Sequence, residues 1–225
     1  MNINTVDITT HENPTHTIIW LHGLGADSTD SFQLLNYLNI TELKLRFVCP
    51  DAKKRIITIN NNSIMRAWYD IKSNDLSENI DISGIQDSAN IIRHLIKKEI
   101  SQGIRSENII LGGFSQGSVI SLYTAMNLSV KIAGVVCLSG YLPDIKNEIT
   151  NIFNANKNTP FFIAHGLFDE IIPINKFYTC ISELKKNGYY LITKKEYTHG
   201  HNVNEEELQD IRSFITNIVN NNLLF

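Results

Sequence analysis

The chain has 225 residues, of which 43% are hydrophobic and 19% charged, and its formal net charge at pH 7 is −3. These values are ordinary for a globular protein with a sizeable core, and the lack of a basic excess argues against a nucleic-acid-binding protein. No apolar run approaches the roughly 18 residues that a membrane-spanning helix needs. The N-terminus also lacks the basic and apolar regions of a secretory signal, so neither an integral membrane protein nor a secreted one is expected.

Strand-like and helix-like segments alternate along the chain. Short β-branched runs predict strands at 16–21, 45–50, 108–114, 131–140, 160–166 and 189–197. Helical periodicity predicts helices at 31–38, 82–100, 116–126, 174–188 and from about residue 204 onward. In the 82–100 helix the expected buried stripe is Ile85, Ala89, Ile92, Leu95, Ile96 and Ile100. This alternation predicts an α/β fold whose mostly parallel sheet carries helices on both faces, in a single domain spanning 1–225.

Residues 51–83 show the weakest pattern and are predicted to be irregular. Aromatic and aliphatic side chains lie in this segment, among them Trp68, Tyr69, Ile71 and Leu76. Long irregular segments in compact domains are often functional, which suits a mobile flap over an apolar groove. Ordinary core packing explains the same side chains equally well.

Three cysteines, Cys49, Cys137 and Cys180, lie far apart and among apolar neighbours. Their number is odd and their spacing is unlike that of a metal site. We interpret them as reduced core residues of a cytoplasmic protein.

The stretch Gly-Phe-Ser-Gln-Gly at 113–117 joins a predicted strand to a predicted helix. It matches the G-x-S-x-G nucleophile elbow in the context which that motif requires. A sharp strand-to-helix turn leaves no room for side chains at Gly113 and Gly117, and it lifts the hydroxyl of Ser115 clear of the backbone. A tight turn with an incidental serine is the alternative.

A serine needs a base, and the base needs a third group to orient it. On such a sheet the chain order is serine, carboxylate, histidine. Asp169 follows the predicted strand 160–166 and His201 follows the strand 189–197, so both fall at the same sheet edge as Ser115. The competing carboxylates are Glu170 and Asp144, and the competing base is His199.

Backbone N–H groups must hold the oxyanion that forms when the serine attacks. Gln116 directly follows the serine, and Leu24 lies in the loop "HGLG" after the first predicted strand. A phosphate-binding loop would need a third glycine and a lysine, which "HGLG" lacks. A metal site formed by His165, Asp169, His199 and His201 is a further alternative. H-x-H on a loop is not a specific ligand pattern, however, and the hydrolase interpretation needs neither a metal nor a cofactor.

Six motifs in order, "LHGLGAD", "RAWYDI", "GFSQGS", "LSGYLP", "HGLFDEIIP" and "HGHNVNEEEL", resemble those of the acyl-protein thioesterases and the small bacterial carboxylesterases grouped with them. The resemblance spans about residues 17–218 and implies an α/β-hydrolase fold. By motif position it implies Ser115 as nucleophile, Asp169 as acid and His201 as base. It places Leu24 and Gln116 at the oxyanion hole, and Trp68, Tyr141 and Ile171 along the acyl groove.

The residues and the resemblance together predict a serine esterase that cleaves carboxylic esters or thioesters of acyl chains through an acyl-enzyme. The substrate would be a small ester, a lipid or a lipidated protein, and an apolar surface beside the groove would suit a homodimer. A lysophospholipase-type lipid esterase and a catalytically silent binding module are the alternatives.

Overall fold

The computed structural model describes residues 3–143 and 154–221. Within them, seven strands form one sheet in the order β1-β3-β2-β6-β7-β8-β9. Their bounds are β1 Thr5–Thr9, β2 His16–Leu21, β3 Leu45–Pro50, β6 Ile109–Phe114, β7 Gly134–Leu138, β8 Phe161–Gly166 and β9 Ile192–Tyr197. β1 runs antiparallel to β3, and the other neighbouring pairs of this sheet are parallel. The predicted mostly parallel sheet is confirmed.

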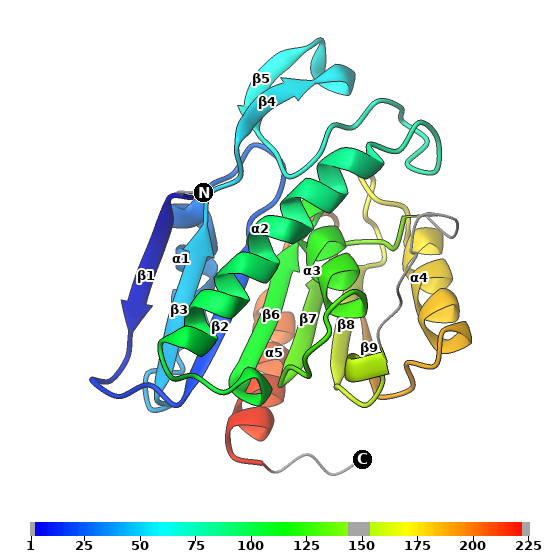
Figure 1. Ribbon diagram of the computed structural model, residues 1–225. Helices are drawn as coiled ribbons and strands as arrows, with labels where there is room; N and C mark the ends of the chain where they lie inside the picture. The colour runs from blue at the N-terminus through cyan, green and yellow to red at the C-terminus, as the bar shows by residue number, and fades with distance from the viewer. Residues whose placement is uncertain (1–2, 144–153, 222–225) are drawn as a thin grey trace.

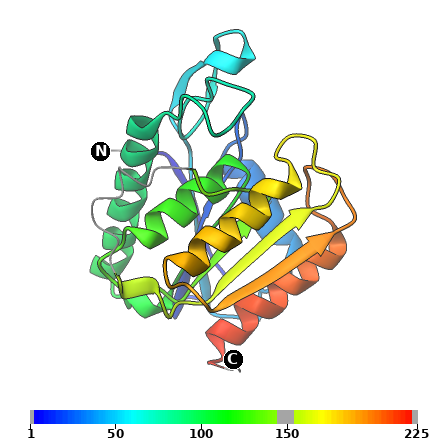
Figure 2. The same cartoon turned by 90° about the vertical axis from the view of Figure 1, so that its right-hand side faces the viewer.

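The helices cover both faces of this sheet (Figures 1 and 2). α2, α3 and α4 lie on one face, and α1 and α5 on the other. The α-helices are α1 Ser28–Tyr37, α2 Ile82–Ser101, α3 Gln116–Met126, α4 Ile174–Lys186 and α5 Glu205–Val219, and the 3-10 helices are Thr58–Asn60, Ser106–Asn108 and Asn154–Asn156. None of the helices in the described part of the chain is both long and apolar enough to cross a bilayer.

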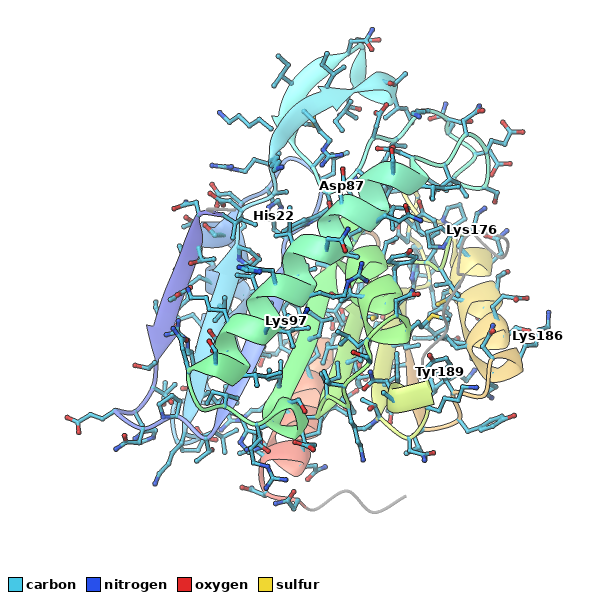
Figure 3. All side chains as sticks on the ribbon, viewed as in Figure 1. His22, Asp87, Lys97, Lys176, Lys186 and Tyr189 are labelled. Carbon is cyan, nitrogen blue, oxygen red and sulfur yellow. The ribbon has the colours of Figure 1, made fainter. Side chains whose placement is uncertain are left out.

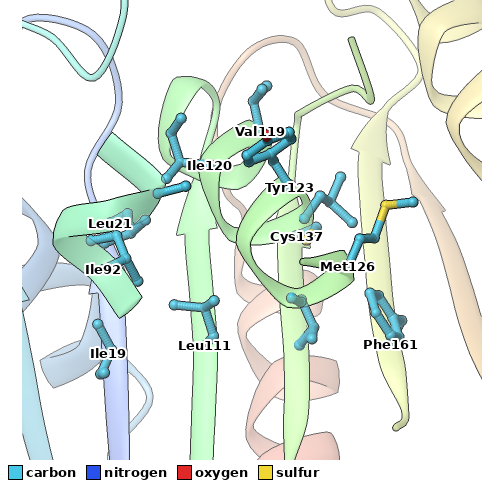
Figure 4. Close-up of a cluster of buried hydrophobic side chains, with 14 of the residues drawn as sticks. Ile19, Leu21, Ile92, Leu111, Val119, Ile120, Tyr123, Met126, Cys137 and Phe161 are labelled. Atoms are coloured by element: carbon cyan, nitrogen blue, oxygen red, sulfur yellow. The ribbon is translucent and has the colours of Figure 1, made fainter. Parts of the chain in front are cut away.

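Two hydrophobic cores follow from the alternation of side chains along each strand. Ile19 and Leu21 of β2 point to the core beneath α2, α3 and α4, part of which Figure 4 shows. Ile18 and Trp20 point to the opposite core, beneath α1 and α5. Because both faces are covered, the central strands are apolar at nearly every position. The three cysteines are buried and free, as predicted.

The buried face of α2 departs from the prediction at its last turn. Ile100 is 36% exposed, whereas the neighbouring Glu99 is 1% exposed. The carboxylate of Glu99 accepts hydrogen bonds from Thr17 Oγ1 at 2.9 Å and Arg46 Nε at 3.0 Å. A buried charge is tolerated when it is paired in this way, and the apolar stripe therefore ends before residue 100.

Residues 51–83 are not irregular throughout, which corrects the prediction. β4 (Lys54–Ile57) and β5 (Ser63–Arg66) form an antiparallel hairpin that projects above the sheet (Figure 1). Asn61 and Asn62 make its turn with φ of 53° and 58°, the left-handed region that asparagine tolerates better than most residues. Both strands are largely exposed, so they lack the buried alternation that predicted the other strands.

The edge strand β1 was not predicted either. Its residues are exposed or half-buried, and they pair with β3 from Thr5 opposite Pro50 to Thr9 opposite Arg46. A strand at the edge of a sheet with little buried surface leaves only a weak pattern in the sequence.

The loops that follow β2, β6, β8 and β9 meet at one edge of the sheet, because the four strands are parallel. His22, directly after β2, lies at this edge below the hairpin (Figure 3). The sheet thereby brings together residues that are far apart in the sequence.

Candidate active site

Ser115 occupies a strained turn between β6 and α3. Its φ is 54° and its ψ is −119°, an unfavourable conformation for a residue with a side chain. The turn is held by the bond from Ser115 N to Leu138 O, at 2.8 Å. A Cβ on Gly113 would lie 2.6 Å from the carbonyl carbon of Gly117, and a Cβ on Gly117 would overlap Leu21 O. Both glycines are therefore required by close backbone approach, as the motif predicts.

Ser115, His201 and Asp169 form a continuous hydrogen-bonded chain. His201 Nε2 lies 2.9 Å from Ser115 Oγ, and His201 Nδ1 lies 2.7 Å from Asp169 Oδ2. A carboxylate can only accept, so the proton of the neutral ring is on Nδ1, and Nε2 is left to accept from the hydroxyl. The ring also packs on Phe114, with 4.9 Å between ring centroids.

The carboxylate of Asp169 is buried and surrounded by donors. Oδ1 accepts from Ile171 N at 2.9 Å and Ile172 N at 2.8 Å, and Oδ2 lies 3.3 Å from His165 Nε2 in addition to His201. Burial by itself would raise the pKa of Asp169. The hydrogen bonds from His165, His201 and Ile172 outweigh burial and hold this pKa well below its usual range. The group therefore stays ionised beside His201.

The competing base, His199, is bound elsewhere. Its Nδ1 lies 2.9 Å from Gly200 O and its Nε2 lies 3.1 Å from Glu207 Oε2. Burial raises the pKa of Glu207 to about 8, and Asp210 adds to the shift. A protonated Glu207 donates to Nε2 while Nδ1–H donates to the carbonyl, which satisfies both ring nitrogens away from Ser115.

Of the two competing carboxylates, Glu170 makes no hydrogen bond or ion pair with His201 among the described residues. Glu170 is exposed, next to the buried Asp169. Asp144 lies outside the described residues. Gly166 explains why the loop after β9 fits so closely against the loop after β8, because a Cβ there would overlap the carbonyl oxygens of His199 and Gly200.

Two main-chain N–H groups near Ser115 have no partner among the described residues. Gln116 stands at the first position of α3, where a helical N–H has no intrahelical partner, and Leu24 N donates no hydrogen bond. Both residues line the pocket that contains Ser115. Two such free donors beside a serine suit an oxyanion hole.

The loop that carries Leu24 is fixed on three sides. His22 Nδ1 lies 2.7 Å from Gly23 O, and His22 Nε2 accepts from Ala52 N at 2.9 Å. Gly25 N donates to Arg66 O at 2.9 Å, which ties the loop to the end of β5. Hydrogen bonds to Ala52 and Arg66 therefore hold the loop in place on both sides of Leu24.

The side chain of Gln116 makes contacts that the sequence did not predict. Its Oε1 accepts from Trp68 N at 2.7 Å, and its Nε2 donates to Tyr69 O at 2.8 Å. Gln116 thus joins the turn at Ser115 to the segment that follows the hairpin. The only signal in the sequence was the glutamine itself, directly after the serine.

A pocket of about 700 Å³ opens over Ser115 and His201. Tyr141 and Ile171 line it, together with Tyr69, Ile71 and Leu76. Trp68 is not among the lining residues, which differs from the prediction. Its side chain is 1% exposed, and its Nε1 donates to His22 O at 2.9 Å, so it packs behind the loop that carries Leu24.

The described residues include no group of three or more His, Cys, Asp or Glu side chains arranged to hold a metal ion. His165, Asp169 and His201 do converge, but through hydrogen bonds that one carboxylate accepts from two imidazoles. His199 does not join them.

Comparison with known proteins gives a consistent result. The sequence profile of the phospholipase/carboxylesterase family matches residues 4–219. Acyl-protein thioesterase 1 of Saccharomyces cerevisiae is 36% identical over 212 residues, covering 88% of this chain and 91% of that protein. The Candida albicans protein of the same name is 37% identical over 213 residues, covering 90% of this chain and 91% of its own. The crystal structure of Zea mays acyl-protein thioesterase 2 superposes with a TM-score of 0.82 at 28% identity, covering 96% of this chain and 99% of that one.

Proposed function

Because the chain belongs to the phospholipase/carboxylesterase family and is a serine hydrolase of acyl esters or thioesters, we propose that Ser115, His201 and Asp169 are its catalytic residues. The observation that carries the proposal is the hydrogen-bonded chain from Ser115 Oγ through both nitrogens of His201 to Asp169, at the mouth of the apolar pocket.

The reaction follows from the positions of the protons. Ser115 Oγ attacks the acyl carbonyl carbon while His201 Nε2 takes the hydroxyl proton. Asp169 stays ionised and stabilises the imidazolium that forms. The N–H groups of Leu24 and Gln116 donate to the oxyanion, which the carbonyl oxygen becomes.

The tetrahedral intermediate then collapses to an acyl-serine. His201 gives its proton to the leaving alcohol or thiol as the bond from the acyl carbon to the leaving atom breaks. A water enters, His201 takes one of its protons, and the hydroxide attacks the acyl-serine. Collapse of the second intermediate returns the proton to Ser115 and releases the carboxylic acid.

We propose a long-chain acyl thioester on a protein as the substrate. The relatives in Saccharomyces cerevisiae and Candida albicans are named acyl-protein thioesterases, and the pocket of about 700 Å³ falls within the usual range for ligand sites. Apolar side chains of Ile71, Leu76 and Ile171 in its wall suit an acyl chain. The buried free thiols support a reducing compartment such as the cytoplasm.

The test compares the wild-type protein with Ser115→Ala and the matched control Ser118→Ala. Substrates are p-nitrophenyl esters from acetate to palmitate, a palmitoyl-cysteine peptide and a lysophospholipid. We expect Ser115→Ala to lose on the order of a millionfold in kcat, as nucleophile removal does in other serine hydrolases. Ser118→Ala should stay near wild type, because the Ser118 hydroxyl is buried without a hydrogen-bond partner among the described residues.

Near-wild-type turnover by Ser115→Ala would overturn the assignment of the nucleophile. A preference for the lysophospholipid over the palmitoyl-cysteine peptide would overturn the proposed substrate class and leave the nucleophile in place.

A further inference from the structure

His165 is a second histidine on the carboxylate of Asp169. It is the residue before Gly166, the last residue of β8, and its side chain is 0% exposed. Its Nε2 lies 2.8 Å from Ile172 O and 3.3 Å from Asp169 Oδ2. Both partners are acceptors, so this nitrogen must carry a proton that the two oxygens share.

The opposite ring nitrogen settles the protonation state. His165 Nδ1 is buried and has no hydrogen-bond partner among the described residues. A proton there would be a buried donor without an acceptor, which is costly. The ring is therefore neutral with its proton on Nε2, and it is held against Phe177 with 5.6 Å between ring centroids.

We propose that His165 is a positioning residue for the reaction, whose shared Nε2–H fixes the Asp169 carboxylate toward His201. This inference rests on the proposed function, because it assigns a task to a neighbour of the proposed acid. His165 touches neither the substrate nor Ser115, and it acts through Asp169.

The hydrogen bond from His165 also affects the electrostatics of the site, because Asp169 Oδ2 interacts with both His165 and His201. That oxygen accepts from His201 Nδ1 at 2.7 Å and lies 3.3 Å from His165 Nε2. Without the second donor, more of the negative charge acts on His201. An opposite charge favours the protonated form of a base, so the acid limb of the pH profile of kcat/KM should move to higher pH.

The same proton also fixes one wall of the pocket. Ile172 O accepts from His165, while Ile171 N and Ile172 N donate to Asp169 Oδ1. Histidine, carboxylate and loop thus form a closed ring of hydrogen bonds. Because Ile171 and Ile172 line the pocket, loosening this ring should also raise KM.

Two variants separate the donor from the bulk of the side chain. His165→Leu keeps an apolar group beside Phe177 and removes the proton. His165→Gln restores N–H donors at a similar reach, and its two hydrogens can serve both oxygens. The matched control is His16→Leu, since His16 is also buried but begins β2 at the opposite edge of the sheet.

The measurements are the pH profile of kcat/KM on p-nitrophenyl esters, the rate of labelling by a fluorophosphonate and the thermal unfolding midpoint. We expect His165→Leu to lose about tenfold to a hundredfold in kcat/KM, the usual range for a lost hydrogen bond to a charge. Its acid limb should move up by about half a pH unit to one unit. His165→Gln should recover most of the rate and the wild-type limb, and His16→Leu should leave both unchanged.

Three outcomes would overturn the inference. The first is a His165→Leu protein that is folded, labelled at the wild-type rate and unshifted in its pH profile. The second is a His165→Gln protein that falls as far as His165→Leu although it melts at the wild-type temperature. The third is a rate loss in His16→Leu equal to that in His165→Leu. A wild-type protein that fails to react with the fluorophosphonate would instead count against the proposed function itself.

Discussion

Two histidine–carboxylate pairs lie at the same edge of the sheet, and their histidines are only two residues apart in the sequence. The two pairs differ in what the second ring nitrogen of each histidine contacts. His201 meets Asp169 at 2.7 Å and turns its other nitrogen to Ser115. His199 meets Glu207 at 3.1 Å and turns its other nitrogen to Gly200 O. Both carboxylates are buried, so burial alone does not distinguish the pairs.

The two carboxylates differ in the number of hydrogen-bond donors around them. Asp169 is surrounded by four donor groups, and its pKa is lowered. Glu207 has His199 as its side-chain partner, its Oε1 has none among the described residues, and burial raises its pKa to about 8. Hydrogen bonds to the charged form, more than depth, decide which carboxylate is ionised at neutral pH.

Exchanging each histidine for glutamine tests the difference most strongly. His201→Gln removes the proposed base, and we expect a loss on the order of a millionfold in kcat. His199→Gln can still donate and accept, so its kcat should fall by less than about tenfold. Turnover of p-nitrophenyl esters at saturation measures both. Equal losses in the two variants would mean that the assignment of the base to His201 is wrong.

Exchanging each carboxylate for its amide should give a smaller but still clear contrast. Asp169→Asn presents an N–H to His201 and favours the wrong tautomer, which costs about ten-thousandfold in kcat in comparable enzymes. Glu207→Gln keeps a donor for His199 Nε2 and should stay within about threefold of wild type. The same ester assay, combined with a thermal unfolding midpoint for each variant, separates chemistry from folding. A Glu207→Gln protein that is folded but as slow as Asp169→Asn would contradict the contrast.

The pH dependence of stability should have opposite signs at the two carboxylates. Glu207 has a pKa of about 8 when folded and 4.5 when unfolded. Between these values the folded protein keeps a proton that the unfolded chain has released, so stability falls as pH rises, by on the order of a few kcal/mol. Asp169 has a folded pKa below its ordinary 3.8, so its contribution is present above that pH and is lost as pH falls below it.

Urea unfolding between pH 5 and 9 measures the first of these effects. Glu207→Gln cannot ionise, so its stability should lose this decline, and it should exceed the wild type most clearly at pH 9. Parallel curves for the two proteins would show that Glu207 is already ionised in the folded protein across this pH range and would contradict the raised pKa.

The turn around Ser115 could be predicted from the sequence because the pattern that identifies it lies within five consecutive residues. The glycines at 113 and 117 are demanded by backbone contacts with the turn and with β2, and the turn carries its own pattern. Asp169 and His201 could be proposed from chain order and sheet edge. Choosing His201 over His199 from the residues themselves was not possible, because the choice depends on Glu207, eight residues further along in α5.

The parts that sequence missed depend on contacts between distant segments. The motif that contains Trp68 implies that this residue lines the acyl groove. In the structure its indole N–H instead donates a hydrogen bond to His22 O. The Gln116 side chain reaches Trp68 and Tyr69, 47 or more positions earlier in the chain. The β4–β5 hairpin buries too little surface to leave a periodic pattern. Whether residues 51–83 move as a flap stays a prediction.

At the turn that carries Ser115, the stability of the fold and the placement of the serine hydroxyl have opposite requirements. A left-handed serine with φ of 54° costs about 1–3 kcal/mol that a glycine would not, so the fold itself would favour losing the residue. Replacing Ser115 by glycine would therefore relieve the strain of the turn and at the same time remove the hydroxyl from the site.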